Sequence, residues 1–335
     1  MREFSSLTLL EVLSELKRPA NTLITCHVKP DGDAIGSAFA LKELLTALGS
    51  RVWVVCAEEC PHRLAFLLDE EQRSILPESI PEGFSEDRVI AVDTASPGQA
   101  GTLFDRFGDR YTLSVDHHGR GTPFCDHWIL PDAAATGEMI FALARELVKE
   151  GALDRIPLGA AERMYAAMSS DTGSFKYSNA TPETYRAASD LIESGVDHAE
   201  MNRKLFSSVP YLQLAAQYEG FSRLRRFCDG RIAVIPFPYE AKVKLGIRDE
   251  HTETLVDTAR IIEGVEIAFV LKQPTEAPLF RLSMRSAIDF DVSAVCAAFG
   301  GGGHVRAAGA TITDAADMEE AVERVLEEIN RRFPT

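Results

Sequence analysis

The chain has 335 residues and a formal net charge of −16, and 45% of its residues are hydrophobic while 26% are charged. This length predicts two domains of ordinary size, and the composition is typical of a soluble globular protein. The acidic balance excludes proteins that coat long nucleic acids, because these need a broad basic surface to neutralise phosphates. It still allows a short anionic substrate beside bound divalent cations, which reverse the local charge.

Signals for a membrane or for secretion are missing from the sequence. No apolar run approaches the roughly 20 residues that a membrane span needs. Leucines near the N-terminus recur at helical spacing among charges, without the small-residue cleavage site of a signal peptide. The six cysteines form no CxxC pair, so we interpret them as reduced packing thiols. These features predict a cytoplasmic protein that does not bind membranes.

Strand-like and helix-like segments alternate in the first half of the chain. Strands are expected at residues 22–27, 51–56, 89–93 and 112–116. Helices are expected at residues 34–48, 134–150 and 158–170. This alternation predicts an α/β fold with a parallel sheet covered by helices on both faces. Ligands bind outside the carboxyl ends of such strands, where His27, Asp93 and Asp116 are expected to converge.

The second half has a different pattern, which begins with helices over residues 182–226. Strands are expected at residues 232–237, 265–271 and 279–285, and helices at 291–299 and 316–332. The order predicts a smaller mixed α/β domain, with the boundary between the two domains in the helical region near 190–215.

The segment between His27 and Asp33 contains one imidazole and two carboxylates within seven residues, on a strand-to-helix turn. Divalent Mn, Mg, Fe or Co accept such nitrogen and oxygen ligands. As an alternative, Asp33 is a helix N-cap, which leaves His27 and Asp31 unexplained. This segment alone leaves both interpretations open.

Three further segments place polar groups after apolar ones. Asp93 follows an apolar strand, where a buried carboxylate is costly unless it is paired or bound to a metal. For Asp93 alone, an aspartate in a turn or at a helix N-cap is the simpler interpretation. Asp116, His117 and His118 end another strand. One histidine can bind metal and the other can donate to a phosphate oxygen, with Asp116 orienting a ring. Asp171, which follows a helix, is by itself an ordinary loop aspartate.

Taken together, the four segments supply enough ligands for two divalent cations with one shared carboxylate. These ligands are His27, Asp31, Asp33, Asp93, His117 and Asp171. Two cations about 3.5–4 Å apart can hold a hydroxide and stabilise the attacking and leaving oxygens of a phosphoryl transfer. The signal is the occurrence of all four segments in this order.

At this point the sequence resembles the DHH phosphoesterases, and most of all their bacterial nanoRNase and pAp phosphatase group. The first half carries four similar motifs, HVKPDGDAIGS (27–37), AVDTA (91–95), SVDHH (114–118) and SSDTGSF (169–175). In the second half, FRLSMRS (280–286) and FGGGGHVRAAGA (299–310) resemble the DHH-associated C-terminal domain. The resemblance implies a catalytic domain at 1–190, a helical linker at 191–222 and a substrate-binding domain at 223–335.

The resemblance also implies roles for individual residues. One metal ion is expected to be held by His27, Asp31 and Asp93. The other is expected to be held by Asp33, Asp93, His117 and Asp171. His118 is expected to face the scissile phosphate, with Asp116 as the second catalytic residue. Two Mn²⁺ ions are the expected cofactors, with Mg²⁺ or Co²⁺ as alternatives.

The C-terminal motifs also have a physical interpretation. Consecutive glycines let the backbone approach an anion closely, and the guanidinium of Arg285 suits phosphate. The alternatives are a floppy loop and an ordinary surface arginine. The expected substrate-binding residues are Arg285, Ser286, Gly301, Gly302, Gly303, His304 and Arg306.

The expected function is metal-dependent hydrolysis of short oligoribonucleotides, dinucleotides or pAp. Alternatives are a cyclic-dinucleotide phosphodiesterase, an inorganic pyrophosphatase or exopolyphosphatase, and a non-catalytic nucleotide-binding module. The expected partners are short single-stranded RNA or DNA oligonucleotides or small nucleotides. Long duplexes and membranes are not expected to bind, and the sequence is compatible with a homodimer.

Overall fold

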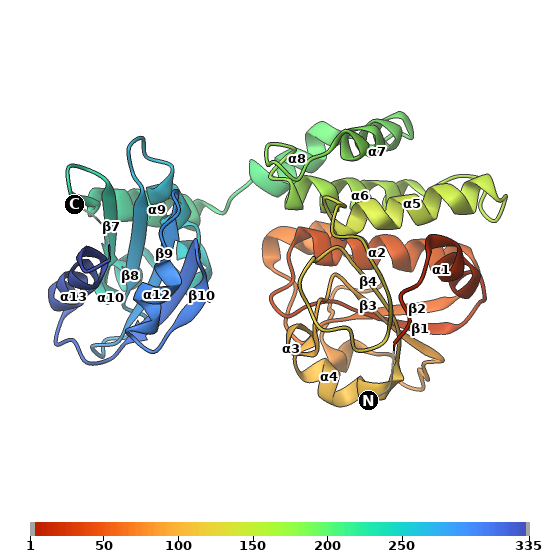
Figure 1. Cartoon of the computed structure of the whole chain (residues 1–335), viewed down its shortest axis with the longest axis horizontal. Coiled ribbons are helices and arrows are strands. Elements are labelled where there is room, and N and C mark those ends of the chain that lie inside the picture. Colours follow the sequence, from red (N-terminus) through yellow and green to blue (C-terminus); the bar gives the residue numbers. More distant parts are fainter. Residues whose placement is uncertain (1–3, 333–335) are drawn as a thin grey trace. The chain divides into compact units, whose positions relative to one another are not determined.

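The computed structural model describes residues 4–332, which form two compact units that meet in sequence between Ser208 and Val209 (Figure 1). The three-part division at 190 and 222 stays a prediction. The first and last residues of this predicted division, 1–3 and 333–335, lie outside the described residues. No helix between residues 4 and 332 combines the length and apolar character needed to cross a bilayer.

A five-stranded parallel sheet in the order β2-β1-β3-β4-β5 forms the centre of the first unit. Its strands are β1 Asn21–Thr25, β2 Arg51–Val55, β3 Arg88–Val92, β4 Tyr111–Asp116 and β5 Asp126–Ile129. Every residue of β3 is buried, as expected for the centre of a parallel sheet with both faces covered. Since the strands are parallel, their carboxyl ends share one edge.

Helices cover both faces of this sheet. They are α1 Leu9–Leu16, α2 Gly32–Ala47, α3 Pro97–Ala100, α4 Thr102–Phe107, α5 Thr136–Lys149, α6 Leu158–Asp171, α7 Pro182–Glu193 and α8 His198–Phe206. Short 3-10 helices are η1 His62–Leu67, η2 Pro77–Ser79 and η3 Gly108–Arg110. Helix α2 is buried on nearly all sides, because it lies between the sheet and helices α5 and α6 (Figure 1). The opposite face packs against Leu103 and Phe107 of α4.

The second unit contains a six-stranded mixed sheet in the order β10-β11-β9-β8-β7-β6. Its strands are β6 Arg225–Phe227, β7 Ile232–Phe237, β8 Ile267–Lys272, β9 Phe280–Ser286, β10 Gly302–His304 and β11 Ala307–Ile312. Only β7 and β8 are parallel neighbours among the described strands of this sheet.

The helices of the second unit lie on both faces of its sheet. They are α9 Tyr211–Ser222, α10 Tyr239–Leu245, η4 Asp249–Thr252, α11 Leu255–Arg260, α12 Val292–Ala297 and α13 Met318–Asn330. Helices α12 and α13 pack on one face, and α9, α10 and α11 pack on the other. Burial alternates along β9, so Leu282 and Met284 enter the core with α12 and α13. Arg281, Ser283 and Arg285 therefore lie on the opposite face of the strand.

Candidate metal centre

The turn that follows β1 carries three of the expected metal ligands. His27 Nδ1 donates to a backbone carbonyl oxygen at 2.7 Å, and Nε2 lies 3.8 Å from Asp31 and 3.4 Å from Asp93. Asp31 is the N-cap of α2, because its carboxylate accepts two backbone N–H hydrogen bonds at 3.0 Å. The interpretation of Asp33 as the N-cap was wrong, since Asp33 lies within the first helical turn.

Asp33 is fully buried and is held by three donors. Its carboxylate accepts hydrogen bonds from the Ser37 hydroxyl at 2.8 Å and from the backbone N–H groups of Thr136 at 2.7 Å and Gly137 at 2.9 Å. These two N–H groups begin α5, where backbone donors are unpaired and the helix dipole favours an anion. Burial, reinforced by the charge of Asp93, nevertheless raises the pKa of Asp33 well above its usual range.

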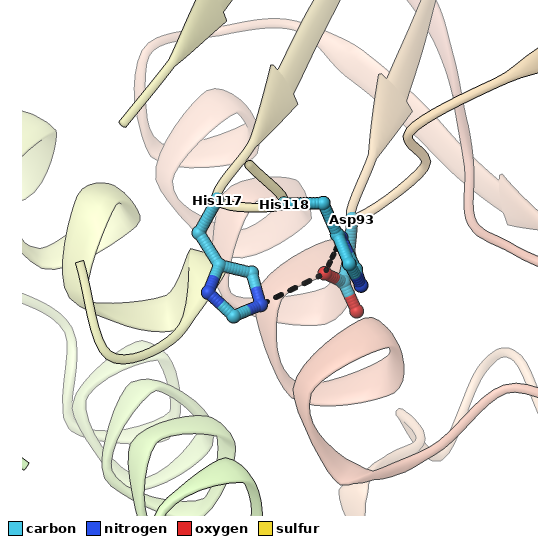
Figure 2. A group of neighbouring side chains, drawn as sticks. All are labelled: Asp93, His117 and His118. Atoms are coloured by element: carbon cyan, nitrogen blue, oxygen red, sulfur yellow. Dashed lines mark ion pairs between the residues drawn. The ribbon is translucent and has the colours of Figure 1, made fainter. Parts of the chain in front are cut away.

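Asp93 follows β3 directly and lies at the centre of the cluster. Its φ of 54° is in the left-handed region, which is strained for residues other than glycine and is often found at functional sites. The backbone N–H donates to Val115 at 2.9 Å, and the side chain, only 2% exposed, accepts from the Thr136 hydroxyl at 3.0 Å. Figure 2 shows that His117 and His118, which follow β4, both approach the same oxygen of this carboxylate.

His117 is oriented by its own backbone contact. Nδ1 donates to the carbonyl oxygen of Ala133 at 3.1 Å, so Nε2 is the nitrogen that faces the carboxylates. Nε2 lies 3.4 Å from Asp171 and 3.7 Å from both Asp33 and Asp93. A histidine whose second nitrogen is bound to a backbone carbonyl is a common arrangement for metal ligands, because it fixes the tautomer.

His118 is oriented differently, by Asp116. The Nδ1 of His118 lies 2.7 Å from a carboxylate oxygen of Asp116, which is fully buried. This hydrogen bond outweighs burial and raises the pKa of His118 to about 9. Because Asp116 occupies Nδ1, the other nitrogen is available to donate, and the side chain is 37% exposed.

Potential ligand atoms form three groups at this site, and within each group all atoms lie within 4.8 Å of one another. These are His27, Asp31 and Asp93; Asp33, His117 and Asp171; and Asp93, His117 and His118. The first two groups contain all six ligands expected from the sequence. His118 approaches the third group through Nδ1, 3.6 Å from Asp93, but that nitrogen is already used by Asp116. The assignment of the six residues as ligands stays a prediction, which this geometry supports.

The charge balance also fits bound cations. Burial lowers the pKa of His27, but hydrogen bonds with Asp31 and Asp93 outweigh it and raise the pKa to about 11. Burial, together with the charges of neighbouring carboxylates, raises the pKa of Asp171 to about 6. Four carboxylates held this close repel one another, and divalent cations offset that repulsion.

This repulsion predicts a pH dependence for the metal-free protein. With its pKa raised from 3.8 to about 6, folded Asp171 holds a proton that the unfolded chain has released. The free energy of unfolding therefore falls as pH rises through this window. In EDTA, the Tm of Asp171→Asn should exceed that of wild type by several degrees at pH 7.5 and by little at pH 4.5. Each kcal/mol in the free energy of unfolding shifts Tm by about 2–4 °C. Parallel Tm curves for the two proteins would contradict this.

Four residues of the site were missed by the sequence interpretation. Thr136, Gly137 and Ser37 hold the carboxylates of Asp33 and Asp93, as described above. The side-chain amide of Asn179 donates to the carbonyl oxygens of Ala134 at 3.1 Å and Asp171 at 3.2 Å, and so fixes the end of α6. Only the Thr-Gly pair at the expected start of a helix offered a signal for a site.

The residues expected to bind substrate lie together in the second unit. Arg285 on β9 is opposite Ala307 on β11, which is itself opposite His304 on β10. Arg285 approaches Asp257 at 3.3 Å, while His304 and Arg306 are exposed. The hydroxyl of Ser286 is buried and donates to a backbone carbonyl at 2.8 Å, which favours a structural role for this residue.

The last two glycines of the run, Gly302 and Gly303, begin β10, so the run is not a floppy loop. A Cβ at Gly301 would lie 2.2 Å from the carbonyl oxygen of Gly309, and one at Gly303 would lie 2.6 Å from that of Ala307. Pairing of β10 with β11 therefore explains these two glycines. A Cβ at Gly302 would meet nothing within 4 Å, so the described residues give no steric reason for glycine there.

Comparison with known proteins identifies the family. Residues 21–168 match the DHH family, N-terminal domain, and residues 235–333 match the DHHA1 domain. The protein from Thermus thermophilus that is named bifunctional oligoribonuclease and PAP phosphatase NrnA is 32% identical over 326 residues. That alignment covers 96% of this chain and 93% of the relative. The chain belongs to the DHH family.

Solved structures share the fold of this DHH-family chain. An exopolyphosphatase-related protein from Bacteroides fragilis aligns with a TM-score of 0.84 and 24% identity, over 99% of this chain and 98% of that chain. The exonuclease RecJ bound to manganese aligns with a TM-score of 0.52 and 17% identity, over 100% of this chain and 97% of that chain. The α/β fold class, with a parallel N-terminal sheet and a mixed C-terminal domain, is confirmed.

Proposed function

We propose that this DHH-family phosphoesterase hydrolyses short oligoribonucleotides, dinucleotides and pAp with the help of two divalent cations. The observation that carries the proposal is the convergence of His27, Asp31, Asp33, Asp93, His117 and Asp171 around Asp93, with His118 beside them. The relative from Thermus thermophilus supports the choice of substrates, because its name includes both oligoribonuclease and PAP phosphatase.

The residues at this edge of the first sheet fit divalent cations by their chemistry. His27, Asp31 and Asp93 would hold one ion, and Asp33, His117 and Asp171 would hold the other, with Asp93 shared. Such ions lower the pKa of water and stabilise negative charge on phosphate oxygens. Mn²⁺ is the proposed ion, supported by the manganese in RecJ.

The chain itself supplies a positioned proton donor. Asp116 holds the ring of His118 through Nδ1 and raises the pKa of the imidazole, which leaves Nε2–H as the group that can donate. This donor is placed to bind a phosphate oxygen as negative charge develops on it. Hydrogen bonds from Ser37, Thr136 and Gly137 hold the carboxylate of Asp33 in place, so this side chain does not need to reorganise during the reaction.

A panel of substrates with Mn²⁺ tests the proposal. We expect kcat/KM to be highest for a 5′-phosphorylated RNA dimer, short oligomers and pAp, and low for a much longer strand. Preferred turnover of cyclic di-AMP or pyrophosphate would favour the alternative enzymes. No turnover of any compound with Mn²⁺, Mg²⁺ or Co²⁺ would favour a non-catalytic nucleotide-binding module.

Arg285 and His304 are proposed to hold the part of the substrate that is not cleaved. We expect Arg285→Ala and His304→Ala to lower kcat/KM for a dinucleotide about tenfold or more, because each loses one charge-assisted contact. Bis-p-nitrophenyl phosphate, which lacks a second nucleotide, should be hydrolysed nearly as fast as by wild type. Equal losses on both substrates would contradict the holding role.

The remaining expectations about partners are part of the same proposal. Short single-stranded RNA or DNA and small nucleotides are the proposed ligands, without binding of long duplexes or membranes. The cytoplasmic location and the homodimer also stay predictions.

A further inference from the structure

A groove of about 450 Å³ lies in the second unit, on the face of the sheet that carries the side chains of Arg281 and Arg285. We name it the β9 groove. Its polar floor comes from Lys272 on β8, Arg281 and Ser283 on β9, and Gly309 and Thr311 on β11. Phe299, Gly300 and Gly301 also line it. Of the residues that line the groove, only Gly301 was expected from the sequence to bind substrate.

Strand register places two cations side by side in this groove. Lys272 and Arg281 are direct partners across β8 and β9, and Thr311 is the partner of Arg281 on β11. Directly opposed side chains in an antiparallel pair have Cβ atoms about 4.5–5.5 Å apart, where like charges destabilise the sheet. The fold therefore carries a local cost that a bound anion would remove.

The acidic residues nearby only partly offset these charges. Asp249 lies 3.0 Å from Arg281, but its other carboxylate oxygen accepts from Lys242 at 2.6 Å. Lys272 makes no hydrogen bond or close ion pair with any residue between 4 and 332, and the negative charges that act on it, those of Asp249 and Glu253, are more distant. Burial outweighs these charges and lowers the pKa of Lys272. A half-buried ammonium group without a direct hydrogen-bond acceptor is costly, since it has lost part of its hydration.

The other polar groups of the groove are also available. Among the described residues, the hydroxyls of Ser283 and Thr311 have no hydrogen-bond partner in the protein. Gly309, the direct partner of Ser283 on β11, has no side chain to block an approaching ligand. Two cations and two hydroxyls around an open glycine form a set of donors that suits a phosphate group.

We propose that the β9 groove binds a phosphate of a single-stranded oligonucleotide, at a position separate from the one that Arg285 contacts. Arg281 and Arg285 lie four residues apart on β9, a separation of about 14 Å along a strand that rises about 3.4 Å per residue. This separation is longer than the spacing of neighbouring phosphates in a nucleic acid, so the two arginines contact different nucleotides. A dinucleotide is too short to occupy both positions, while a tetranucleotide reaches them.

The inference rests on the proposed function, and an equilibrium binding measurement separates the two. Fluorescence anisotropy in EDTA gives Kd for 5′-phosphorylated RNA dimers and tetramers labelled at the 3′ end, without hydrolysis. The variants are Lys272→Met, which keeps the aliphatic stem, and Arg281→Gln, at an exposed position. Lys244→Met, an exposed cation on α10, is the control for a general loss of charge.

We expect each groove variant to bind the tetramer about tenfold more weakly, which corresponds to one lost contact, and to bind the dimer within about twofold of wild type. The slope of log K against log salt for the tetramer should fall by about 0.7 for each lost phosphate contact. The Lys244→Met control should match wild type at both lengths. A purely structural role for Lys272 would leave the salt slope unchanged.

Three results would overturn the inference: equal losses for dimer and tetramer, no loss for the tetramer, or no binding of the tetramer by wild type. If the groove binds only a free small anion, the variants will bind the tetramer as tightly as wild type does, which is the second of these results. If wild type hydrolyses no oligonucleotide with Mn²⁺ but the length-dependent losses appear, the proposed function fails and the groove stands. If hydrolysis occurs but the losses are absent, only the groove fails.

Discussion

Replacing Asp93 with asparagine is expected to lower kcat/KM for an RNA dimer by at least about 10³-fold, the upper end of the range for losing one transition-state contact. Asp93 is the only residue that the proposed ligand sets share. Asparagine keeps the shape of the side chain and the hydrogen bond from Thr136, and it tolerates the left-handed backbone that Asp93 adopts. The loss would therefore come from the missing charge.

Thermal unfolding separates this explanation from a folding defect. A ligand that binds only the folded state, at a concentration about 100 times its Kd, adds about 2.7 kcal/mol to the free energy of unfolding. The Tm of wild type should therefore rise when Mn²⁺ is added. Asp93→Asn should lose most of this gain, while its Tm in EDTA stays equal or rises, since a buried like charge is gone. Asp190→Asn, on the exposed side of α7, is the matched control. A full Mn²⁺ gain in Asp93→Asn would contradict the shared-ligand role.

The second large effect is expected at His118. His118→Ala should lower kcat about 10²–10³-fold, because a donor to the developing charge is removed. His118→Asn is the companion variant, since its amide can replace Nδ1 beside Asp116 but nothing replaces Nε2. Both variants should keep the gain in Tm that Mn²⁺ gives to wild type.

Two outcomes would overturn this division of roles. Loss of the Mn²⁺-dependent gain in Tm in both variants would make His118 a metal ligand, as the third ligand group allows. Near wild-type kcat in His118→Asn would show that the contact with Asp116, and not Nε2, is the important one.

Much of the fold was predictable because its central elements have strong periodic patterns. The buried apolar runs at β1, β3 and β4 and the long helices α5 and α6 lie close to their expected positions. β5 was missed because Asp126 and His127 interrupt its pattern. β10 and β11 were missed because glycine and alanine have low strand propensity, and pairing between neighbours determines their structure.

The candidate site was predictable in its ionisable residues but not in what holds them. Strand ends brought His27, Asp93 and His117 to one edge of the sheet, as the parallel topology requires. Two of the three donors to Asp33 came from the start of α5, about 100 residues away in sequence, so no local pattern connects them with Asp33. The β9 groove was likewise invisible, because it depends on the register that places Lys272 opposite Arg281.

The central claim is that the cluster around Asp93 is a two-ion centre, and the number of bound ions tests it most directly. Equilibrium dialysis against Mn²⁺, followed by elemental analysis, gives the ions bound per chain for wild type and for Asp93→Asn. We predict two ions per wild-type chain and fewer than one per Asp93→Asn chain. Wild type without bound Mn²⁺, or equal occupancy in the two proteins, would contradict the assignment.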